Sequence, residues 1–258
     1  MVLGFIGTGG ISEAIITGLY NCAGYAEPIL VSTRNRTRSR RLAASFDLIE
    51  PVEDNQEIVD RSDWVVISVL PKQTPGVLTA LRFGENHQVI SLSAGITLDV
   101  LARHILPATR VCRAIPMPPI EFGLGPIPIC PPNPEVERLF DRVGTAVAVD
   151  DERQFTALGA SSAVMATFFA WVASSARWLE SQSVPAEDSA LYATSVFHAL
   201  ATMTTRTDAA GLQRMSQECL TSGGLNEQVL EAVRKAGLIE QLQAEINRVM
   251  ARLSHSAG

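Results

Sequence analysis

The sequence has few cysteines and only a modest excess of one charge. Four cysteines occur among 258 residues, without a Cys-x-x-Cys pair and without a neighbouring histidine. This scatter argues against a zinc site or a disulfide framework and favours reduced thiols in a cytoplasmic protein. The net charge is −6, and basic residues gather in one short stretch. Nucleic-acid binding is therefore not an expected function.

Long hydrophobic runs are also scarce. No apolar run reaches the length that we expect of a membrane-spanning helix, so no membrane association is predicted. The chain opens directly on what we interpret as its first strand, so no signal peptide is expected. Apolar residues nevertheless make up 47% of the chain. This length and composition suffice for a sizeable core and for two modest domains.

The N-terminal segment combines a short apolar strand with a glycine-rich turn and a following helix. This order aims the free N–H groups of the first helical turn at one point, which suits a pyrophosphate. Gly7 would permit the tight turn, Gly9 the close approach of the backbone, and Ser12 close packing of helix on strand. An ordinary strand-to-helix turn is the alternative. The segment predicts dinucleotide contacts from Gly7, Thr8, Gly9, Gly10, Ile11 and Ser12.

The stretch after the second expected strand, residues 28–32, indicates which dinucleotide binds. NAD sites usually have an acid there, but none occurs between Glu27 and Asp47. Five arginines stand there instead, and guanidinium groups bind phosphate bidentately, which favours the 2′-phosphate of NADP(H). We expect cofactor contacts from Arg34, Asn35 and Arg36, and solvated helix positions for Arg40 and Arg41. A purely solvated basic face is the alternative, although basic residues at a helix start oppose the helix dipole.

The first part of the chain alternates strands with helices. Continuous apolar runs at residues 63–70, 87–92 and 109–115 are typical of strands buried on both faces. Helical stretches are expected at 73–81 and 98–105, shorter strands in the proline-rich passage 116–134, and a last strand at 145–149. This rhythm predicts an α/β, Rossmann-like domain over residues 1–150, with a parallel, doubly wound sheet.

Beyond residue 150 the pattern is helical. Residues 155–180 form one expected helix that is apolar on most faces, and such a helix is buried, often by a partner chain. Further helices are expected at 187–204, 212–219, 226–235 and 239–253. The sequence thus predicts an all-α domain over residues 151–258 that serves dimerisation and substrate binding.

Four motifs together resemble the pyrroline-5-carboxylate reductase family over nearly the whole chain. They are Val-Leu-Pro-Lys-Gln at 69–73, Ile-Ser-Leu-Ser-Ala-Gly-Ile-Thr at 90–97, Arg-Ala-Ile-Pro-Met-Pro-Pro at 113–119 and Thr-Ser-Gly-Gly-Leu-Asn at 221–226. The last is the most specific. The resemblance implies NADPH-dependent reduction of a small cyclic imino acid, with 1-pyrroline-5-carboxylate and L-proline as the expected pair. It also implies a homodimer built from C-terminal helices, which some relatives assemble further into rings.

The resemblance also assigns residues. For the cofactor it adds Asn55, Val69, Leu70, Pro71, Gln73, Ala94 and Gly95. For the substrate it indicates Ser222, Gly223, Gly224, Leu225 and Asn226. In this segment the backbone N–H groups of Gly224, Leu225 and Asn226 would bind the substrate carboxylate at a helix start. Asn226 stands at the catalytic position, where its amide would donate one further hydrogen bond. The alternative for 222–226 is a helix-capping turn without a ligand, and Asn55 is also expected to cap a helix.

The chain departs from the family around the substrate and the nicotinamide. Met117-Pro118 replaces a polar Asn-Thr pair, and Asn226 replaces a threonine. Two alternatives therefore stay open: a reductase of a different imine or ketone on the same scaffold, and a non-catalytic NADP-binding regulator.

Overall fold

The computed structural model describes residues 1–255 and divides the chain into two compact units. The first comprises Met1–Ala160 together with the end of the chain from Met250, and the second comprises Ser161–Val249. Each unit is described by itself. The predicted domain boundary near residue 150 stays a prediction.

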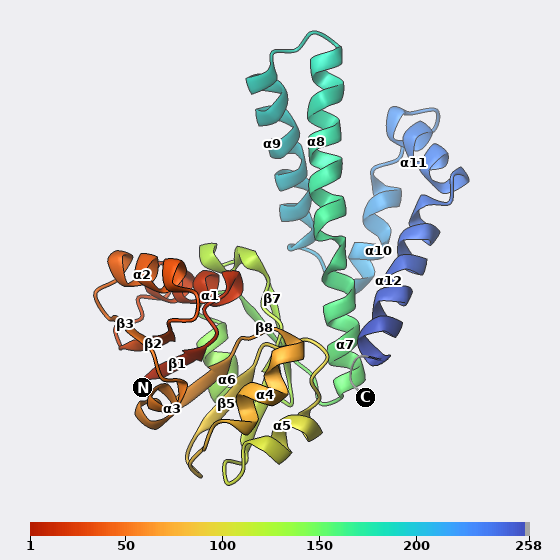
Figure 1. The fold of residues 1–258 in the computed structure, drawn as a ribbon. Helices are drawn as coiled ribbons and strands as arrows, with labels where there is room; N and C mark the ends of the chain where they lie inside the picture. The colour runs from red at the N-terminus through yellow and green to blue at the C-terminus, as the bar shows by residue number, and fades with distance from the viewer. Residues whose placement is uncertain (256–258) are drawn as a thin grey trace. The chain divides into compact units, whose positions relative to one another are not determined.

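The first unit is built on one sheet. Among the described residues, eight strands lie in the order β3-β2-β1-β4-β5-β6-β7-β8 (Figure 1). The bounds are β1 Leu3–Ile6, β2 Ile29–Ser32, β3 Ile49–Val52, β4 Trp64–Ile67, β5 Gln88–Ser91, β6 Arg110–Ala114, β7 Pro126–Cys130 and β8 Thr145–Ala148.

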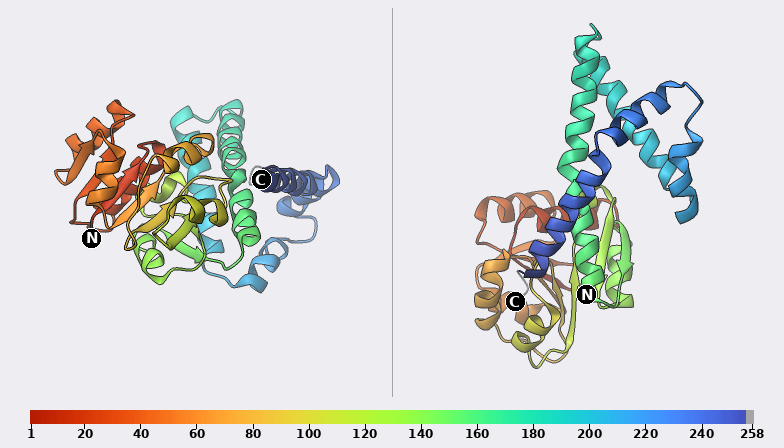
Figure 2. Two further views of the ribbon diagram at one scale, coloured as in Figure 1. Left: turned by 60° about the horizontal axis from the view of Figure 1, so that its bottom comes forward. Right: turned by 90° about the vertical axis from the view of Figure 1, so that its right-hand side faces the viewer.

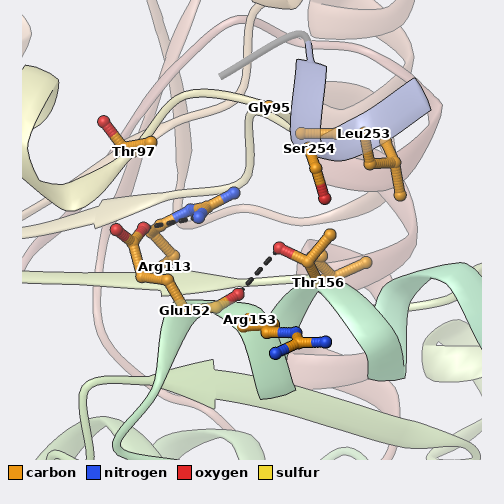
Figure 3. Close-up of a pocket in the computed structure, with 10 residues that line it drawn as sticks. Gly95, Thr97, Arg113, Glu152, Arg153, Thr156, Leu253 and Ser254 are labelled. Atoms are coloured by element: carbon orange, nitrogen blue, oxygen red, sulfur yellow. Dashed lines mark hydrogen bonds and ion pairs between the residues drawn. The ribbon is translucent and has the colours of Figure 1, made fainter. Parts of the chain in front are cut away.

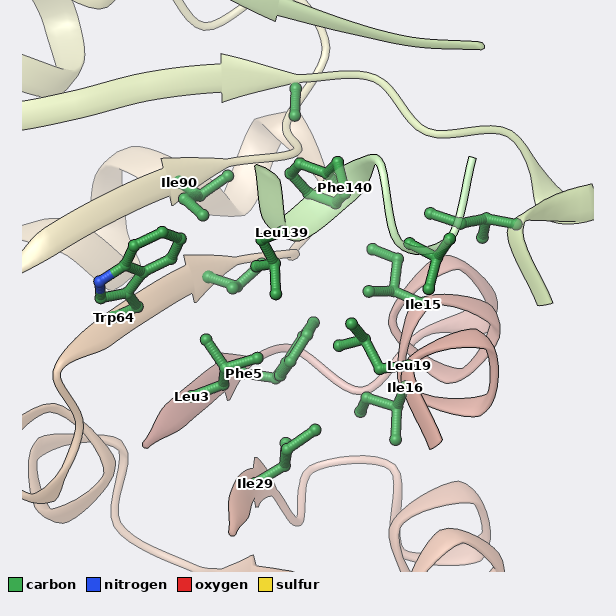
Figure 4. Close-up of a cluster of buried hydrophobic side chains, with 14 of the residues drawn as sticks. Leu3, Phe5, Ile15, Ile16, Leu19, Ile29, Trp64, Ile90, Leu139 and Phe140 are labelled. Carbon is green, nitrogen blue, oxygen red and sulfur yellow. The ribbon is translucent and has the colours of Figure 1, made fainter. Parts of the chain in front are cut away.

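Helices cover both faces of this sheet, which confirms the doubly wound Rossmann-like prediction. The helical segments are α1 Gly10–Asn21, α2 Arg36–Ser45, α3 Asn55–Arg61, η1 Pro71–Gln73, α4 Thr74–Thr79, α5 Leu98–His104, η2 Pro118–Phe122, α6 Pro134–Phe140 and α7 Glu152–Ser161. One apolar cluster packs α1, η2 and α6 on the sheet (Figure 4), and a second packs α3, α4 and α5 on the opposite face.

The continuous apolar runs follow from this double coverage. In β4, Trp64 and Val66 belong to one cluster, and Val65 and Ile67 to the other. Successive side chains of a strand point to opposite faces, so a strand covered on both sides is apolar throughout.

The sheet departs from the all-parallel prediction at one place. β7 runs antiparallel to β6, and β8 then runs parallel to β7. The proline-rich passage contains η2 and the single strand β7, not the several short strands expected. A proline fits the first position of a helical turn because it needs no N–H partner there, and η2 begins with prolines.

The second unit is helical, as predicted. Its segments are η3 Ser162–Val164, α8 Met165–Ser181, α9 Ala186–Thr204, α10 Ala209–Glu218, α11 Leu225–Lys235 and α12 Leu238–His255, of which the last turns belong to the first unit. α8 and α9 run side by side (Figures 1 and 2), and the rings of Phe168 and Phe197 meet edge to face at 5.7 Å.

The helix expected over 155–180 runs from Glu152 to Ser181 in the structure. It contains the 3₁₀ turn η3 between α7 and α8, near glycine and serine residues with low helix propensity. The expectation about membrane-spanning length is wrong. By length and composition alone, Glu152–Ser181 is apolar enough to cross a membrane, with a mean hydropathy of 1.5. Core helices of soluble proteins have the same length and composition, so this is weak evidence for a membrane span.

Candidate dinucleotide-binding cleft

The glycine turn after β1 has the geometry that a phosphate site needs. Gly7 has φ +102°, and a Cβ there would lie 2.3 Å from the Ser68 carbonyl oxygen, so only glycine fits. A Cβ on Gly9, by contrast, would meet no atom within 4 Å. The turn therefore leaves open space above Gly9, at the N-terminus of α1, where a ligand can approach the backbone.

Hydrogen bonds beneath the turn join three strand ends. The Gly7 N–H donates to Ser32 Oγ at 2.9 Å, and Thr8 Oγ1 donates to the Ser32 carbonyl at 2.6 Å. Ser12 Oγ lies within hydrogen-bond distance of both the Gly7 carbonyl oxygen, at 2.7 Å, and Ser68 Oγ, at 2.8 Å. Ser12 is fully buried, so it supports the turn from below and does not line the cleft.

A cleft of about 800 Å³ opens over these strand ends. The predicted residues that line it are Gly7, Thr8, Gly9, Gly10, Ile11, Arg34, Asn35, Arg36, Val69, Leu70, Pro71, Gln73 and Ala94. Sequence reasoning missed Thr37, Ser68, Leu92 and Ser93, which also line it. Ser68 and Leu92 follow directly after β4 and β5, and ligands of such sheets bind beyond the carboxyl ends of the strands. That rule could have found both.

The carboxylate of Glu13 pairs with two of the five clustered arginines. Glu13 of α1 accepts from Arg38 Nη1 at 2.7 Å and from Arg41 Nε at 2.8 Å. Arg41 is therefore paired and not simply solvated, which corrects the prediction, whereas Arg40 is exposed. Arg34 and Arg36 line the cleft. Arg36 lies 3.5 Å from Glu53 in an exposed pair, and Arg34 has no acidic partner among the described residues.

Two loops line the cleft beyond β4 and β5. Ser93 Oγ donates to the Val69 carbonyl at 3.0 Å and lies 2.8 Å from Thr74 Oγ1. These bonds join the loop after β5 to the segment from Val69 to η1, which supplies Leu70, Pro71 and Gln73. Gly95 has φ +77° and lines a separate cavity instead of this cleft.

Asn55 lies outside the cleft and does not cap α3. The capping residue is Asp54, whose side chain accepts from the Gln56 N–H at 2.9 Å, and Asn55 is the first helical residue. Aspartate and asparagine are equally good caps, so the extended backbone of Asp54 decides between the neighbours.

The segment 222–226 belongs to the second unit and begins a helix, as predicted. Gly223 has φ +70° and donates its N–H to Glu227 Oε2 at 2.6 Å. The Gly224 N–H donates to the Thr221 carbonyl, so it is not available as an anion donor. The N–H groups of Leu225 and Asn226 have no acceptor in the described part of the chain. Asn226 Nδ2 donates to the Cys219 carbonyl at 3.2 Å, and Ser222 is exposed.

Met117 precedes η2 and does not line the cleft. A Cβ on Gly18 of α1 would lie 2.3 Å from the Ile120 carbonyl oxygen, so η2 and α1 pack with backbone contact. The proline-rich turn therefore supports α1, whose first residues line the candidate cleft.

Comparison with known proteins extends the local picture to the whole chain. The profile of the family described as NADP oxidoreductase coenzyme F420-dependent matches residues 2–95. The pyrroline-5-carboxylate reductase of Haemophilus influenzae is 29% identical over 178 residues, which is 65% of either chain. That of Vibrio alginolyticus is 24% identical over 97% of this chain and 95% of its own length. The Plasmodium falciparum pyrroline carboxylate reductase with NADP bound superposes with a TM-score of 0.85, at 16% identity, over 100% of this chain and 98% of that one.

Proposed function

We propose that the chain is a pyrroline-5-carboxylate reductase, which transfers hydride from NADPH to 1-pyrroline-5-carboxylate and releases L-proline; its similarity to such reductases over nearly the whole chain supports this. The observation that supports the proposal is a cleft in which an open glycine turn at a helix start faces Arg34, which has no acidic partner in the described chain, and Arg36, whose pair with Glu53 is exposed. An NAD site usually has a carboxylate after the second strand, but no acidic residue occurs between Glu27 and Asp47.

The residues of the cleft fit NADP(H). The open space above Gly9 admits the pyrophosphate to the N-terminus of α1, and Arg34 and Arg36 would hold the 2′-phosphate. The strand order places the ends of β4 and β5 on the far side of β1 from β2. Val69–Pro71 and Leu92–Ala94 would thus flank the nicotinamide half. The bound cofactor supplies the hydride, and these residues orient it.

For the substrate, the proposal assigns the helix start at 222–226 to the carboxylate. The N–H groups of Leu225 and Asn226, together with the dipole of α11, would bind that anion. The Asn226 amide has no readily ionised proton, so it orients the substrate and is not a general acid. The imine would take its proton from water.

The test is a panel assay of NADPH oxidation. Substrates are cyclic imines with five- and six-membered rings, each with and without a carboxylate, and a small ketone. The proposal expects turnover of the five-membered imino acid and slow or no turnover without the carboxylate. Preferred reduction of a six-membered ring or a ketone would support the alternative of a different substrate, which the replacement of a polar pair by Met117-Pro118 leaves open. NADPH binding without turnover on any member would support the non-catalytic regulator.

The proposed assembly is a soluble, cytoplasmic homodimer. On α8, Phe169, Trp171 and Trp178 are each more than half exposed, and so are Leu191 and Tyr192 on α9. Monomeric proteins rarely expose apolar patches of this size, and a twofold-related copy would cover them.

A further inference from the structure

A second cavity, of about 190 Å³, lies in the first unit behind the loop of residues 92–97 (Figure 3). It shares Ala94 with the dinucleotide cleft, so this loop is the wall between the two spaces. The cavity is lined by Ala94, Gly95 and Thr97 of this loop and by the charged residues Arg113 and Glu152, among others.

Arg113 of β6 lines this cavity, and its charged side chain is only 5% exposed. Its Nη1 donates to Glu152 Oε1 at 2.6 Å, and its guanidinium lies 4.6 Å from the ring centre of Phe155. Its Nε is buried and has no hydrogen-bond partner within residues 1–255. Only Arg113 of this pair is buried, because the Glu152 side chain is 32% exposed. Removing a guanidinium from water is costly, and an ion pair formed at that cost seldom adds stability over apolar residues of the same volume. The pair therefore calls for a role other than stability.

Glu152 Oε1 has a second donor. It accepts from the backbone N–H of Leu98 at 2.9 Å, across 54 residues of sequence. Leu98 is the first residue of α5 and directly follows the loop of residues 92–97. The first N–H groups of a helix have no partner within the helix, so this carboxylate supplies one from α7. A single oxygen thus joins β6, α7 and the end of the loop.

The front of the same loop is held separately. Ser93 Oγ bonds to the segment that supplies Leu70 and Pro71, as described above. Between Ser93 and Leu98 the chain turns through Gly95 at φ +77°, a conformation that costs glycine little. The position of Ala94 in the cleft therefore depends on both anchors, and the rear anchor is the Arg113–Glu152 pair.

We propose that Arg113 and Glu152 are positioning residues for hydride transfer, which hold the loop of residues 92–97 at the distance from the nicotinamide that the reaction needs. The proposal rests on the proposed function. Neither residue touches the substrate in this account. Misplacement of reacting groups by about 1 Å can cost on the order of a hundredfold in rate, so a small movement of this loop has a large effect.

Two substitutions at one position test the proposal, with a neighbour as control. Glu152→Ala removes the acceptor, and Glu152→Gln keeps an oxygen for both donors. Arg153→Ala is the matched control, because Arg153 is exposed and also lines the cavity, but its side chain makes no hydrogen bond or ion pair within residues 1–255. We expect amide hydrogen exchange in residues 92–98 to become roughly tenfold faster in Glu152→Ala. Glu152→Gln and Arg153→Ala should stay close to the native protein.

Single-turnover kinetics give the second readout. In Glu152→Ala, hydride transfer to 1-pyrroline-5-carboxylate should slow by about tenfold or more, while the NADPH dissociation constant changes by less than about threefold. Glu152→Gln should recover most of the rate. A merely structural role would lower thermal stability in both variants without this split between rate and binding.

If Glu152→Ala does not fold, the double variant Arg113→Met/Glu152→Leu replaces it, because it leaves no buried charge unpaired. It should show the same faster exchange in residues 92–98. The proposal would be overturned if amide exchange in residues 92–98 of Glu152→Ala, or of the double variant, were as slow as in the native protein. It would also be overturned if hydride transfer in Glu152→Gln were as slow as in Glu152→Ala. A native protein that reduces no imine would refute the proposed function instead, and hydrogen exchange would still decide whether the pair anchors the loop.

Discussion

At the scale of single residues, the choice of cofactor depends on which arginines are already paired. Glu13 accepts from Arg38 and Arg41, so these two are occupied before any ligand binds. Arg34 and Arg36 stay at the edge of the cleft with no such partner on α1. The number of basic residues in a cluster therefore overstates the number available to a phosphate.

We expect NADPH to bind more tightly than NADH. Arg34→Ala and Arg36→Ala should each weaken NADPH binding by on the order of 1–3 kcal/mol, the cost of one lost charge-assisted contact, and leave NADH binding almost unchanged. Fluorescence titration of both cofactors measures this. Arg40→Ala, on the exposed side of α2, is the control. Equal affinity of the native protein for the two cofactors would contradict the assignment.

The cysteines differ in reactivity for a physical reason. Cys22 and Cys219 are exposed, whereas Cys112 and Cys130 are buried. Burial raises the pKa of Cys112 from 9.0 to about 12, since a thiolate there would lose its hydration. At pH 8, a thiol reagent should therefore modify Cys22 and Cys219 rapidly in the native protein, and Cys112 only after unfolding. Mass spectrometry of the labelled protein would show it, and early labelling of Cys112 would be inconsistent with its burial.

The same shift predicts a pH dependence of stability. The folded-state pKa of Cys112 lies above its unfolded value, so its contribution to stability is fully present below pH 9 and is lost as the pH rises towards 12. Urea unfolding at a series of pH values should show Cys112→Ala less sensitive to pH than the native protein in that window. A parallel pH dependence of the two proteins would contradict this attribution.

At the scale of elements, short polar segments were hardest to predict. β3 has two exposed residues, Glu50 and Pro51, among its four, because it lies at the edge of the sheet. An edge strand shows no continuous apolar run, so periodicity does not reveal it. α6 has seven residues, too few for a clear helical period. The antiparallel direction of β7 was also hidden, since alternation of side chains is the same in both directions.

The residues of the candidate site also differ in whether the sequence alone predicts them. Gly7, Gly9 and the two cleft arginines could be predicted because their pattern is local and rests on backbone geometry or fixed charge. Ser93 and the link from Glu152 to Leu98 could not, because the fold brings these groups together from distant parts of the chain. The cap of α3 was placed one residue late because two good capping residues are adjacent there.

The start of α11 carries its own prediction. Asn226→Ala should raise the KM for the imino acid by the equivalent of on the order of 1–3 kcal/mol and leave NADPH binding intact, because a hydrogen bond to the substrate is lost. Gln228→Ala serves as the control, because Gln228 is exposed and lies two residues further along α11. Steady-state kinetics decide the matter. If KM stays at the native value in Asn226→Ala, the Asn226 side chain makes no contact with the substrate.

At the scale of the whole molecule, the large apolar side chains exposed on α8 and α9 support the proposed dimer. Phe169 is 57% exposed and Trp178 63%. We expect sedimentation at micromolar concentration to show a dimer. Phe169→Asp should dissociate it and abolish activity, because an unpaired charge cannot be buried at an apolar interface without large cost. Phe169→Leu should remain dimeric. A fully active native monomer would refute the dimer.

We propose above that this chain reduces 1-pyrroline-5-carboxylate with NADPH, and one experiment tests this directly. The most direct measurement incubates the native protein with both compounds, follows NADPH loss by absorbance and quantifies L-proline by chiral chromatography in the same sample. The account predicts L-proline in amounts equal to the NADPH consumed, and strongly reduced formation with NADH. NADPH that binds but is not consumed, or is consumed without any proline, would contradict it.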